Sequence, residues 1–552
     1  MVGTLLHVCL AIALIACSDR RDEPAVSALA PRPRGSFQAD STIAARDYVG
    51  PTACGECHPD EHAKWSASLH RVMNQRVGIA AGGASAGGAG ARGDAPAMPI
   101  GDFDSAVVKY AGGEARFERI GGAPTMTVVK AGATVRYRVT RTIGVRGLQE
   151  YVGIEDGGAG NEVRLPFGWW PRRGGWYPQP YFDPWLTEER FDAFAPVREP
   201  WAERCPWCHS TYPFEQRIAR ATGRNLGHGL ERHFEAAPVP ANRDRLALER
   251  QITIGISCES CHLGGRAHAD GAPMHFVPIG ATAIAGAPAP STFTDERRDP
   301  EIVNAVCAQC HSGPSPHFPD GAATRNSSEA LELRAGACDR IRCVDCHDPH
   351  RADSRLDEAR SLAACTRCHD SLADPAAARA HSQHDAVSCL DCHMPRVTMG
   401  IDRYVRTHRI SSPTDAGMLR ASAPNACNLC HLDRTLQWTV DELAARHDVR
   451  LDTRGWKALD DNVGETWLAS SEPAVRLVAA MAYARSPSVA LRRASLPQLL
   501  LGLDDPLAYV RTWMAFAVEE VLGRKLRDGE YDPRAPAAER RRALAKLRRA
   551  RR

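Results

Sequence analysis

The chain has a net charge close to zero and only one long run of apolar residues, and each of these features excludes a class of protein. It contains 69 Lys and Arg against 66 Asp and Glu, so the formal net charge of its 552 residues is only +3. Because nucleic-acid binding depends on a strong basic surplus, this balance argues against a nucleic-acid-binding protein. The apolar run, Leu5–Ala16, is too short to span a bilayer, which excludes a polytopic membrane protein. The length and the hydrophobic share of 43% instead indicate an ordinary globular protein of several domains.

Cysteine and histidine, in contrast, are abundant, with 19 and 21 residues. An odd number of cysteines in a chain of this length does not fit a small disulfide scaffold. Sixteen of the cysteines belong to eight copies of Cys-x-x-Cys-His, and the other three are Cys9, Cys17 and Cys338. In chain order the eight motifs are Cys54, Cys57 and His58; Cys205, Cys208 and His209; Cys258, Cys261 and His262; Cys307, Cys310 and His311; Cys343, Cys346 and His347; Cys365, Cys368 and His369; Cys389, Cys392 and His393; and Cys427, Cys430 and His431.

The spacing of this motif is typical of covalent haem attachment. The two thiols add to the two vinyl groups of one haem, and the adjacent His becomes the proximal ligand of the iron. Paired cysteines also bind zinc, but a zinc site does not require a His directly after every second Cys. A thioredoxin-like redox motif would occur once, within a βαβ unit. The motifs therefore predict eight covalently attached c-type haems, with iron bound by the eight motif histidines.

The second axial ligand decides what each haem can do. A second His makes the iron six-coordinate and suited to electron transfer, whereas an open position admits a small molecule. Met394 and Met399 are alternative thioether ligands, although a Met at such positions more often serves packing. Setting His7 aside, twelve histidines lie outside the motifs, enough to supply eight haems: His62, His70, His228, His233, His268, His275, His317, His350, His381, His384, His408 and His447.

The N-terminus predicts export, as covalent haem attachment also does. Leu5–Ala16 is typical of the apolar core of a secretory signal, and it ends in Leu14-Ile15-Ala16-Cys17, which resembles a bacterial lipoprotein box. On that interpretation Cys17 carries the lipid, while ordinary signal cleavage is the alternative. We expect a lipoprotein in the periplasm or at the outer membrane or cell surface of a bacterium.

The rest of the chain changes character several times. Short β-branched runs separated by Gly-rich turns predict a β-rich insert at about 101–155. An aromatic-rich loop follows, which we expect to pack against the haem domain, with a substrate or partner surface as the alternative. Two similar segments that begin at Pro473 and Pro506 place Arg476 and Arg511 35 residues apart, the scale of a helical repeat. The second segment resembles a HEAT repeat, with an irregular helical domain as the alternative. The predicted segments are 1–17 (signal peptide and lipobox), 18–49 (linker), 50–100 (first haem segment), 101–190 (β-rich insert and aromatic loop), 191–437 (seven-haem domain), 438–535 (HEAT-like helices) and 536–552 (basic tail).

This arrangement predicts a mainly α fold with much loop. The last five motifs occupy only 125 residues, so little chain is left for a side-chain core there, and the haems themselves must fill it. We therefore expect a mainly α fold with a haem-filled core, interrupted by the β-rich insert and completed by an α-helical repeat-like C-terminal domain.

Several motif surroundings resemble those of known multihaem cytochromes. The stretch from Cys54 through Trp65 to His70 resembles the cytochrome c-554 (c-552/4) family, in which the His at the place of His70 is a distal ligand. The stretch from Cys258 to His268 resembles that family's second recurrent element. The stretch from Cys343 to His350 resembles the doubled haem-binding modules of multihaem cytochromes, and the stretch from Cys389 to His408 is similar to elements shared by larger multihaem proteins, including pentahaem nitrite reductases. These resemblances imply that His268, His350 and His408 are distal ligands for haems attached elsewhere in the chain. Weaker distal candidates are His384, His317 and His233, followed by His228 and His447.

The same resemblance limits the reaction. Pentahaem nitrite reductases carry one Cys-x-x-Cys-Lys haem, and none of the eight motifs here ends in Lys. The preferred function is therefore electron transfer through closely spaced haems, between redox partner proteins that dock on the C-terminal helices. The alternative is a haem oxidoreductase that acts on a small nitrogen or sulfur oxyanion, such as nitrite, hydroxylamine or tetrathionate, at one open haem.

Overall fold

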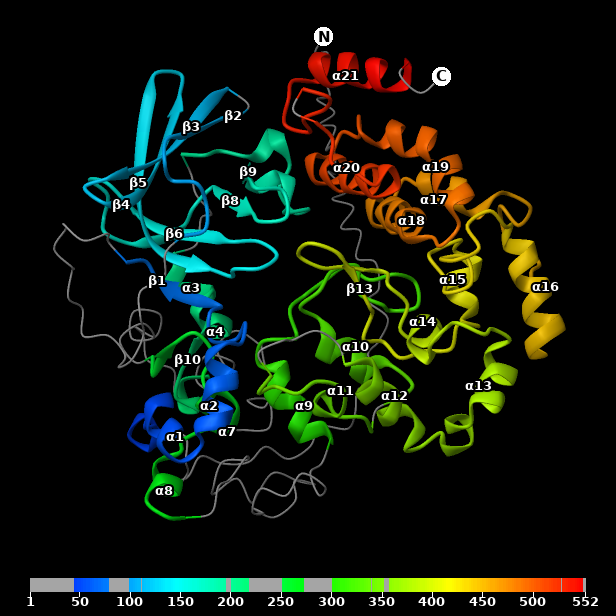
Figure 1. Ribbon diagram of the computed structural model, residues 1–552, viewed down its shortest axis with the longest axis horizontal. Coiled ribbons are helices and arrows are strands. Elements are labelled where there is room, and N and C mark those ends of the chain that lie inside the picture. Colours follow the sequence, from blue (N-terminus) through cyan, green and yellow to red (C-terminus); the bar gives the residue numbers. More distant parts are fainter. Residues whose placement is uncertain are drawn as a thin grey trace, which may run out of the picture. The chain divides into compact units, whose positions relative to one another are not determined.

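The computed structural model combines helices with one larger sheet and several two-stranded ones (Figure 1). The predicted signal peptide and lipobox, most of the 18–49 linker, and the candidates His228 and His233 lie outside the described residues. No helix in the described ranges is long and apolar enough to cross a membrane. The described residues are 44–78, 99–110, 112–194, 200–217, 251–272, 300–338, 340–351, 357–527 and 529–549.

The predicted β-rich insert forms an antiparallel sheet. Its turns contain positive φ angles at Gly121 and Gly122 and again at Ala131 and Gly132, which suit tight two-residue hairpins. The sheet is larger than the expected 101–155, because it gains a strand from the first haem segment and another after residue 155. Its order is β2–β3–β4–β5–β6–β7 with β1 paired to β5, and the strands are β1 (Asn74–Arg76), β2 (Ala106–Tyr110), β3 (Gly113–Ile120), β4 (Ala123–Lys130), β5 (Ala133–Ile143), β6 (Glu150–Glu155) and β7 (Glu162–Arg164).

The aromatic loop packs against this insert, the C-terminal helices and part of the haem domain. It forms a hairpin of β8 (Phe167–Trp170) and β9 (Gly175–Pro178), and the Trp176 ring stacks on Phe117 of β3 with centroids 3.8 Å apart. Trp170 instead contacts Phe516 of the C-terminal helices, with ring centroids 4.9 Å apart. The expected packing against the haem domain is confirmed in part, because Trp185 lies beside Arg325, and Trp170 and Tyr181 belong to a buried cluster that also contains residues of the haem domain.

The motif-bearing segments consist of short helices and loops, as predicted. Two further hairpins are β10 (Ser210–Thr211) with β11 (Thr253–Ile254) and β12 (Thr398–Met399) with β13 (Tyr404–Val405). The helices are α1 (Pro51–Cys57), α2 (Pro59–Ser66), α3 (Trp201–Arg204), α4 (Pro206–His209), α7 (Glu259–His262), α8 (Arg266–Ala269), α9 (Pro300–Ala308), α10 (Glu329–Ala335), α11 (Cys343–Cys346), α12 (Glu358–Thr366), α13 (Pro375–Ser382), α14 (Cys389–His393) and α15 (Ala416–Arg420), with 3₁₀ turns η1 (Ala45–Asp47), η2 (Gln179–Tyr181), η3 (Glu188–Arg190) and η7 (Asp370–Ala373).

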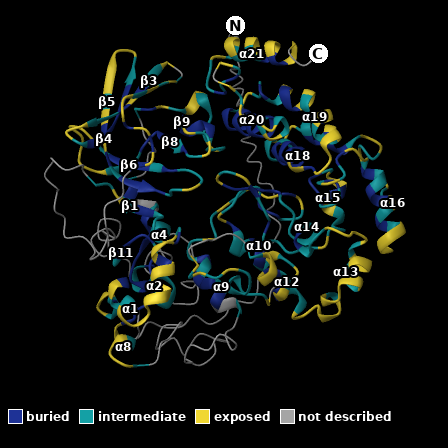
Figure 2. Ribbon diagram, viewed as in Figure 1, coloured by how far each residue is buried: buried dark blue, intermediate teal, exposed yellow. Residues whose placement is uncertain are grey.

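The C-terminal helices form a conventional side-chain core. Helices α18 and α20 pack together and are buried along most of their length. In contrast, α21 buries only Leu544 and Leu547 and exposes most of its basic side chains (Figure 2). The recurrence at Arg476 and Arg511 falls in α18 and α20, and the HEAT-like repeat stays a prediction. The helices are α16 (Leu436–His447), α17 (Val463–Leu468), α18 (Pro473–Arg485), α19 (Val489–Gly502), α20 (Ala508–Leu522) and α21 (Ala537–Arg549).

Candidate haem-binding sites

Each Cys-x-x-Cys-His motif forms about one helical turn. In seven motifs the N–H of the His donates to the carbonyl of the first Cys at 2.9–3.2 Å, and in the remaining one the five residues form α14. Residues three and four apart lie on one side of such a turn, so both thiols and the imidazole project together. None of the seventeen cysteines within the described residues forms a disulfide, which leaves the motif thiols available for thioether bonds.

Five motif histidines face a histidine from elsewhere in the chain at nearly the same separation. Ordinary aromatic packing scatters ring centroids between about 4.5 and 7 Å. Four of the five pairs have nearly parallel rings, and the fifth is tilted. The pairs, with centroid separation and interplanar angle, are His58 with His268 (6.1 Å, 20°), His262 with His350 (6.1 Å, 6°), His347 with His408 (6.2 Å, 27°), His393 with His381 (6.2 Å, 11°) and His431 with His384 (6.2 Å, 49°).

This separation fits one iron ion between two imidazoles. Two metal–nitrogen bonds of about 2 Å each, plus just over ~1 Å from each nitrogen to its ring centre, give about 6 Å between centroids. One imidazole of each pair follows a pair of thiols directly in the chain. The residues present therefore fit a covalently attached haem with two axial histidines.

Hydrogen bonds at Nδ1 prepare several of these imidazoles for metal binding. Nδ1 of His393 lies 2.9 Å from the carbonyl oxygen of Ser411, and Nδ1 of His268 lies 2.8 Å from that of Ala272. His384 makes the same contact with its neighbour Ser382 at 2.6 Å. A carbonyl oxygen only accepts, so Nδ1 carries the proton and Nε2 is left free for a metal.

Two further histidines have electrostatic surroundings that bear on metal binding. Nδ1 of His311 lies 3.3 Å from a carboxylate oxygen of Glu329, which raises the pKa of His311 to about 9. A metal-bound His commonly donates its other N–H to such a carboxylate. Burial lowers the pKa of His408 to about 4, which keeps that imidazole in the neutral, metal-binding form at pH 7.

The predicted distal candidates occupy different kinds of position. His268, His350, His408 and His384 each face a motif imidazole, and the electrostatic influence of His311 on His70 places these two side chains near each other. Outside those pairs, the backbone of His317 forms a β-bridge with Ala323, and the side chain of His447 lies near those of His381 and His384.

His381 is the one paired histidine that the sequence analysis did not single out. It lies in α13, three residues before His384, in the segment between the sixth and seventh motifs. Two histidines at this spacing between two motifs were the only available signal. The structure uses both, one toward His393 and the other toward His431.

The thiols show which motifs are neighbours. Seven motifs form a row in which each has a thiol close to a thiol of the next. The row runs in the order first, third, fourth, fifth, sixth, seventh and eighth motif. The second motif lies beside the fourth, because Cys208 is close enough to Cys310 to lower the pKa of the Cys310 thiol. The other neighbouring thiols are Cys54 and Cys258, Cys261 and Cys307, Cys307 and Cys343, Cys346 and Cys365, Cys365 and Cys389, and Cys392 and Cys430.

A cavity of about 240 Å³ adjoins Cys205 and His209 of the second motif. Trp201 contributes one side of it, with its ring centroid 6.0 Å from that of His209. The remaining lining residues come from the sheet: Ile143 of β5, Glu150 and Val152 of β6, and Arg164 of β7.

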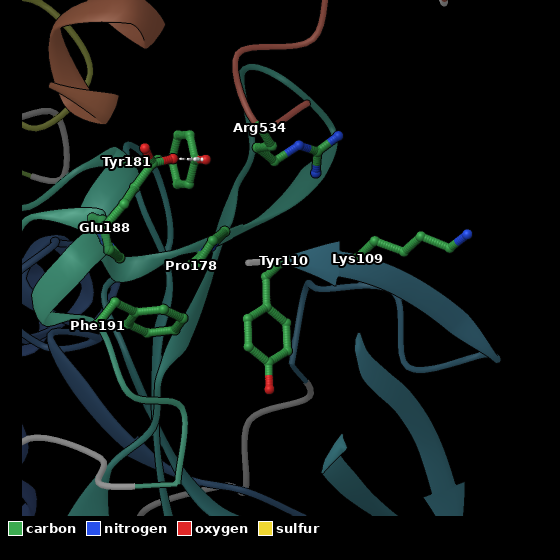
Figure 3. Close-up of a pocket in the computed structure, with 8 residues that line it drawn as sticks. Lys109, Tyr110, Pro178, Tyr181, Glu188, Phe191 and Arg534 are labelled. Atoms are coloured by element: carbon green, nitrogen blue, oxygen red, sulfur yellow. Dashed lines mark hydrogen bonds between the residues drawn. The ribbon is translucent and has the colours of Figure 1, made fainter. Parts of the chain in front are cut away.

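A second pocket, of about 10 Å³, is too small to hold a cofactor (Figure 3). Tyr181 donates a hydrogen bond to Glu188 there, and the buried Arg511 of α20 also binds Glu188 at 2.7 Å. These contacts hold the end of the aromatic loop against the C-terminal helices, so we assign this pocket to packing.

Comparisons with known proteins agree with the motif chemistry. The cytochrome c552 family matches residues 376–463, which include the last two motifs. Similar solved structures include the outer cell wall cytochrome OcwA (15% identity, 90% of this chain and 100% of that chain, TM-score 0.37). The octahaem sulfite reductase MccA of Wolinella succinogenes is another (15% identity, 93% and 86%, TM-score 0.30). No curated protein matches. The chain is a multihaem c-type cytochrome.

Proposed function

We propose that this protein is an exported octahaem cytochrome that transfers electrons along a row of haems. The observation that supports this most directly is the set of five imidazole pairs at 6.1–6.2 Å. When bound, each haem supplies a one-electron iron couple. The paired imidazoles would hold the iron, and two histidine ligands suit electron transfer rather than substrate binding.

The neighbouring thiols support a continuous route. Each pair of motif thiols marks one edge of a haem, so neighbouring thiols bring two haem edges side by side. The thiol of Cys258 lies close enough to Cys54 to raise the pKa of Cys54, and the thiol of Cys343 does the same to the pKa of Cys307. We propose that electrons travel between the first and eighth haems in the order of neighbouring motifs, with the second haem beside the fourth.

The ligand assignments can be tested with two histidines from one region of the chain. His384 faces His431 across 6.2 Å, whereas His447 lies nearby but belongs to none of the five pairs. We expect His384→Ala to convert one low-spin haem to high-spin in the electron paramagnetic resonance spectrum of the oxidised holoprotein. His447→Ala serves as the control and leaves the spectrum unchanged. Equal spectra for the two variants would refute the assignment of His384.

The number of haems and their redox activity are tested together. Mass spectrometry of the mature protein should show eight haems, each adding about 0.6 kDa, because there are eight attachment motifs. Potentiometric titration should then show reversible uptake of eight electrons. Six or fewer haems after complete maturation, or haems that cannot be reduced reversibly, would contradict the proposal.

Export and lipid anchoring belong to the same proposal. Leu14-Ile15-Ala16-Cys17 supports attachment at Cys17, and the anchor would keep the haems outside the cytoplasm. Redox partner proteins would dock on the C-terminal helices. Cys17→Ala should release the protein from the membrane fraction, and unchanged fractionation would remove the lipoprotein assignment.

A further inference from the structure

The fourth motif lies beside three others. The thiol of Cys310 is close to that of Cys208 in the second motif. The thiols of Cys261, in the third motif, and Cys343, in the fifth, are both close to Cys307. On the proposed route, an electron that passes between the third and fifth haems, or leaves the second, therefore meets the fourth haem. The reduction potential of this haem bears on all three exchanges.

The helix that follows the fourth motif folds back onto His311. Helix α10 packs against α9, which contains the first Cys of the motif (Figure 1). The backbone N–H of Ala330 donates to the carbonyl of His311 at 2.9 Å. Glu329, the first residue of α10, places one carboxylate oxygen 3.3 Å from Nδ1 of the same His. The first turn of α10 therefore holds His311 at two points.

The turn before α10 fixes the Glu329 carboxylate. Ser327 has a φ of +76°, in a region that residues other than Gly rarely adopt. Such a conformation persists only where its surroundings hold it. The N–H of Ser327 donates to the second oxygen of Glu329 at 2.8 Å, and its carbonyl accepts from the N–H of Gly313. One carboxylate oxygen is thus held by the turn, and the other faces His311.

The acceptor at His311 differs from those at two other histidines. Nδ1 of His393 contacts the carbonyl of Ser411, which is neutral. Nδ1 of His350 lies 3.8 Å from Asp348, too far for a hydrogen bond. A hydrogen bond to an ionised acceptor is stronger than one to a neutral acceptor and makes a metal-bound imidazole more basic. A more basic ligand stabilises ferric over ferrous iron, which lowers the reduction potential.

We propose that Glu329 is a positioning residue that lowers the reduction potential of the fourth haem through its hydrogen bond to the proximal ligand His311. This inference rests on the proposed haem content and electron transfer, and it adds a residue that regulates the route. The fourth haem takes up and releases one electron, while the Nδ1 proton stays between His311 and Glu329. A haem of lowered potential passes its electron on to its neighbours rather than storing it.

Potentiometric titration of the holoprotein, followed by electron paramagnetic resonance, tests this role. Glu329→Gln removes the charge but keeps an oxygen that can accept from Ser327. The ratio of ferrous to ferric iron in the fourth haem, at a fixed applied potential, should rise about tenfold, which is ~59 mV for one electron. Glu329→Asp keeps the charge and should stay closer to the wild-type protein. The fifth haem should move in the same direction by less, because His347 and His408 also lie within reach of the Glu329 charge.

Asp348→Asn is the matched control. It removes a carboxylate near Nδ1 of His350 and keeps an oxygen that can accept from the backbone N–H of His350. Because no hydrogen bond to an imidazole is lost, every potential should shift by less than the fourth haem does in Glu329→Gln. Equal shifts in the two variants would show that nearby charge alone sets the potential, and would overturn the assignment.

Two further outcomes would overturn the inference. Unchanged potentials in Glu329→Gln would mean that the carboxylate does not tune the haem. A new high-spin ferric signal in that variant would mean that Glu329 merely keeps His311 in place. Either result would leave reversible uptake of eight electrons by the wild-type protein intact, so electron transfer is tested separately. Mass spectrometry checks that each variant carries the same haems as the wild-type protein.

Discussion

The segment from residue 300 to 431 and the helices from residue 463 to 522 are stabilised in different ways. In α18 nine of thirteen residues are buried, and in α20 eleven of fifteen. In contrast, α11 and α13 bury none of their residues, and α14 buries only Leu390. The first segment carries five haem motifs, whereas the second carries none. Several helices that carry or adjoin haem motifs therefore bury few side chains, whereas the C-terminal helices bury most of theirs.

Withholding haem should separate the two regions most strongly. When the full chain is produced without haem attachment, we expect the segment 300–431 to lose protection against amide hydrogen exchange. The helices α17–α20 should keep theirs, because their apolar contacts are already complete. Hydrogen exchange with mass spectrometry resolves the two. Simultaneous loss of protection in both would show that they fold as a single cooperative unit.

Removing a large side chain from the C-terminal core should have the next largest effect. Trp513 is 1% exposed and contacts Trp170 and Phe516. Trp513→Ala should lower the free energy of unfolding of this region by about 3–5 kcal/mol, as is usual for a buried tryptophan. Trp185, 54% exposed, is the control, and Trp185→Ala should have little effect on unfolding. Denaturant unfolding followed by far-ultraviolet circular dichroism measures both. The absorption spectrum of the haems should be the same in the two variants.

A smaller effect is expected at the contact between the aromatic loop and α20. Glu519 pairs with Arg173, and the Arg173 guanidinium lies 4.6 Å from the centroid of the Phe516 ring. Glu519→Gln removes the charge but keeps an oxygen that can accept from the backbone N–H of Leu526. Because the pair is only partly shielded from solvent, the cost should be about 1 kcal/mol. Thermal unfolding compares this variant with Glu114→Gln, which breaks the more exposed pair of Glu114 with Arg116 on β3. The loss of stability in that control should be smaller.

Local sequence patterns predicted the parts of the fold that local chemistry decides. The β-branched runs became strands, with hairpin turns at Gly121 and Gly122, and each motif became a helical turn. The pairing of elements that are far apart in the chain was harder to predict, because it depends on contacts between distant residues. The addition of β1 at Asn74–Arg76 to the sheet, and the packing of Trp170 on α20, had no local signal.

The distal histidines show the same division. A His beside a recognisable motif, such as His268 or His350, could be selected from its local surroundings. His381 has no such context and was missed, although it faces His393. The cavity beside His209 could not be predicted from the sequence, because its lining depends on the register of β5, β6 and β7 in addition to the motif.

The pairing of early motifs with late histidines has a consequence for how the protein is made. If the chain is exported from its N-terminus as proposed, His58, His262 and His347 would leave the membrane before the histidines that face them. His268, His350 and His408 follow much later in the chain. The haems attached first would therefore spend a period with one axial position unfilled, exposed to oxygen and to competing ligands. The speed of secretion, relative to haem attachment, would then set how much of the protein matures without damage.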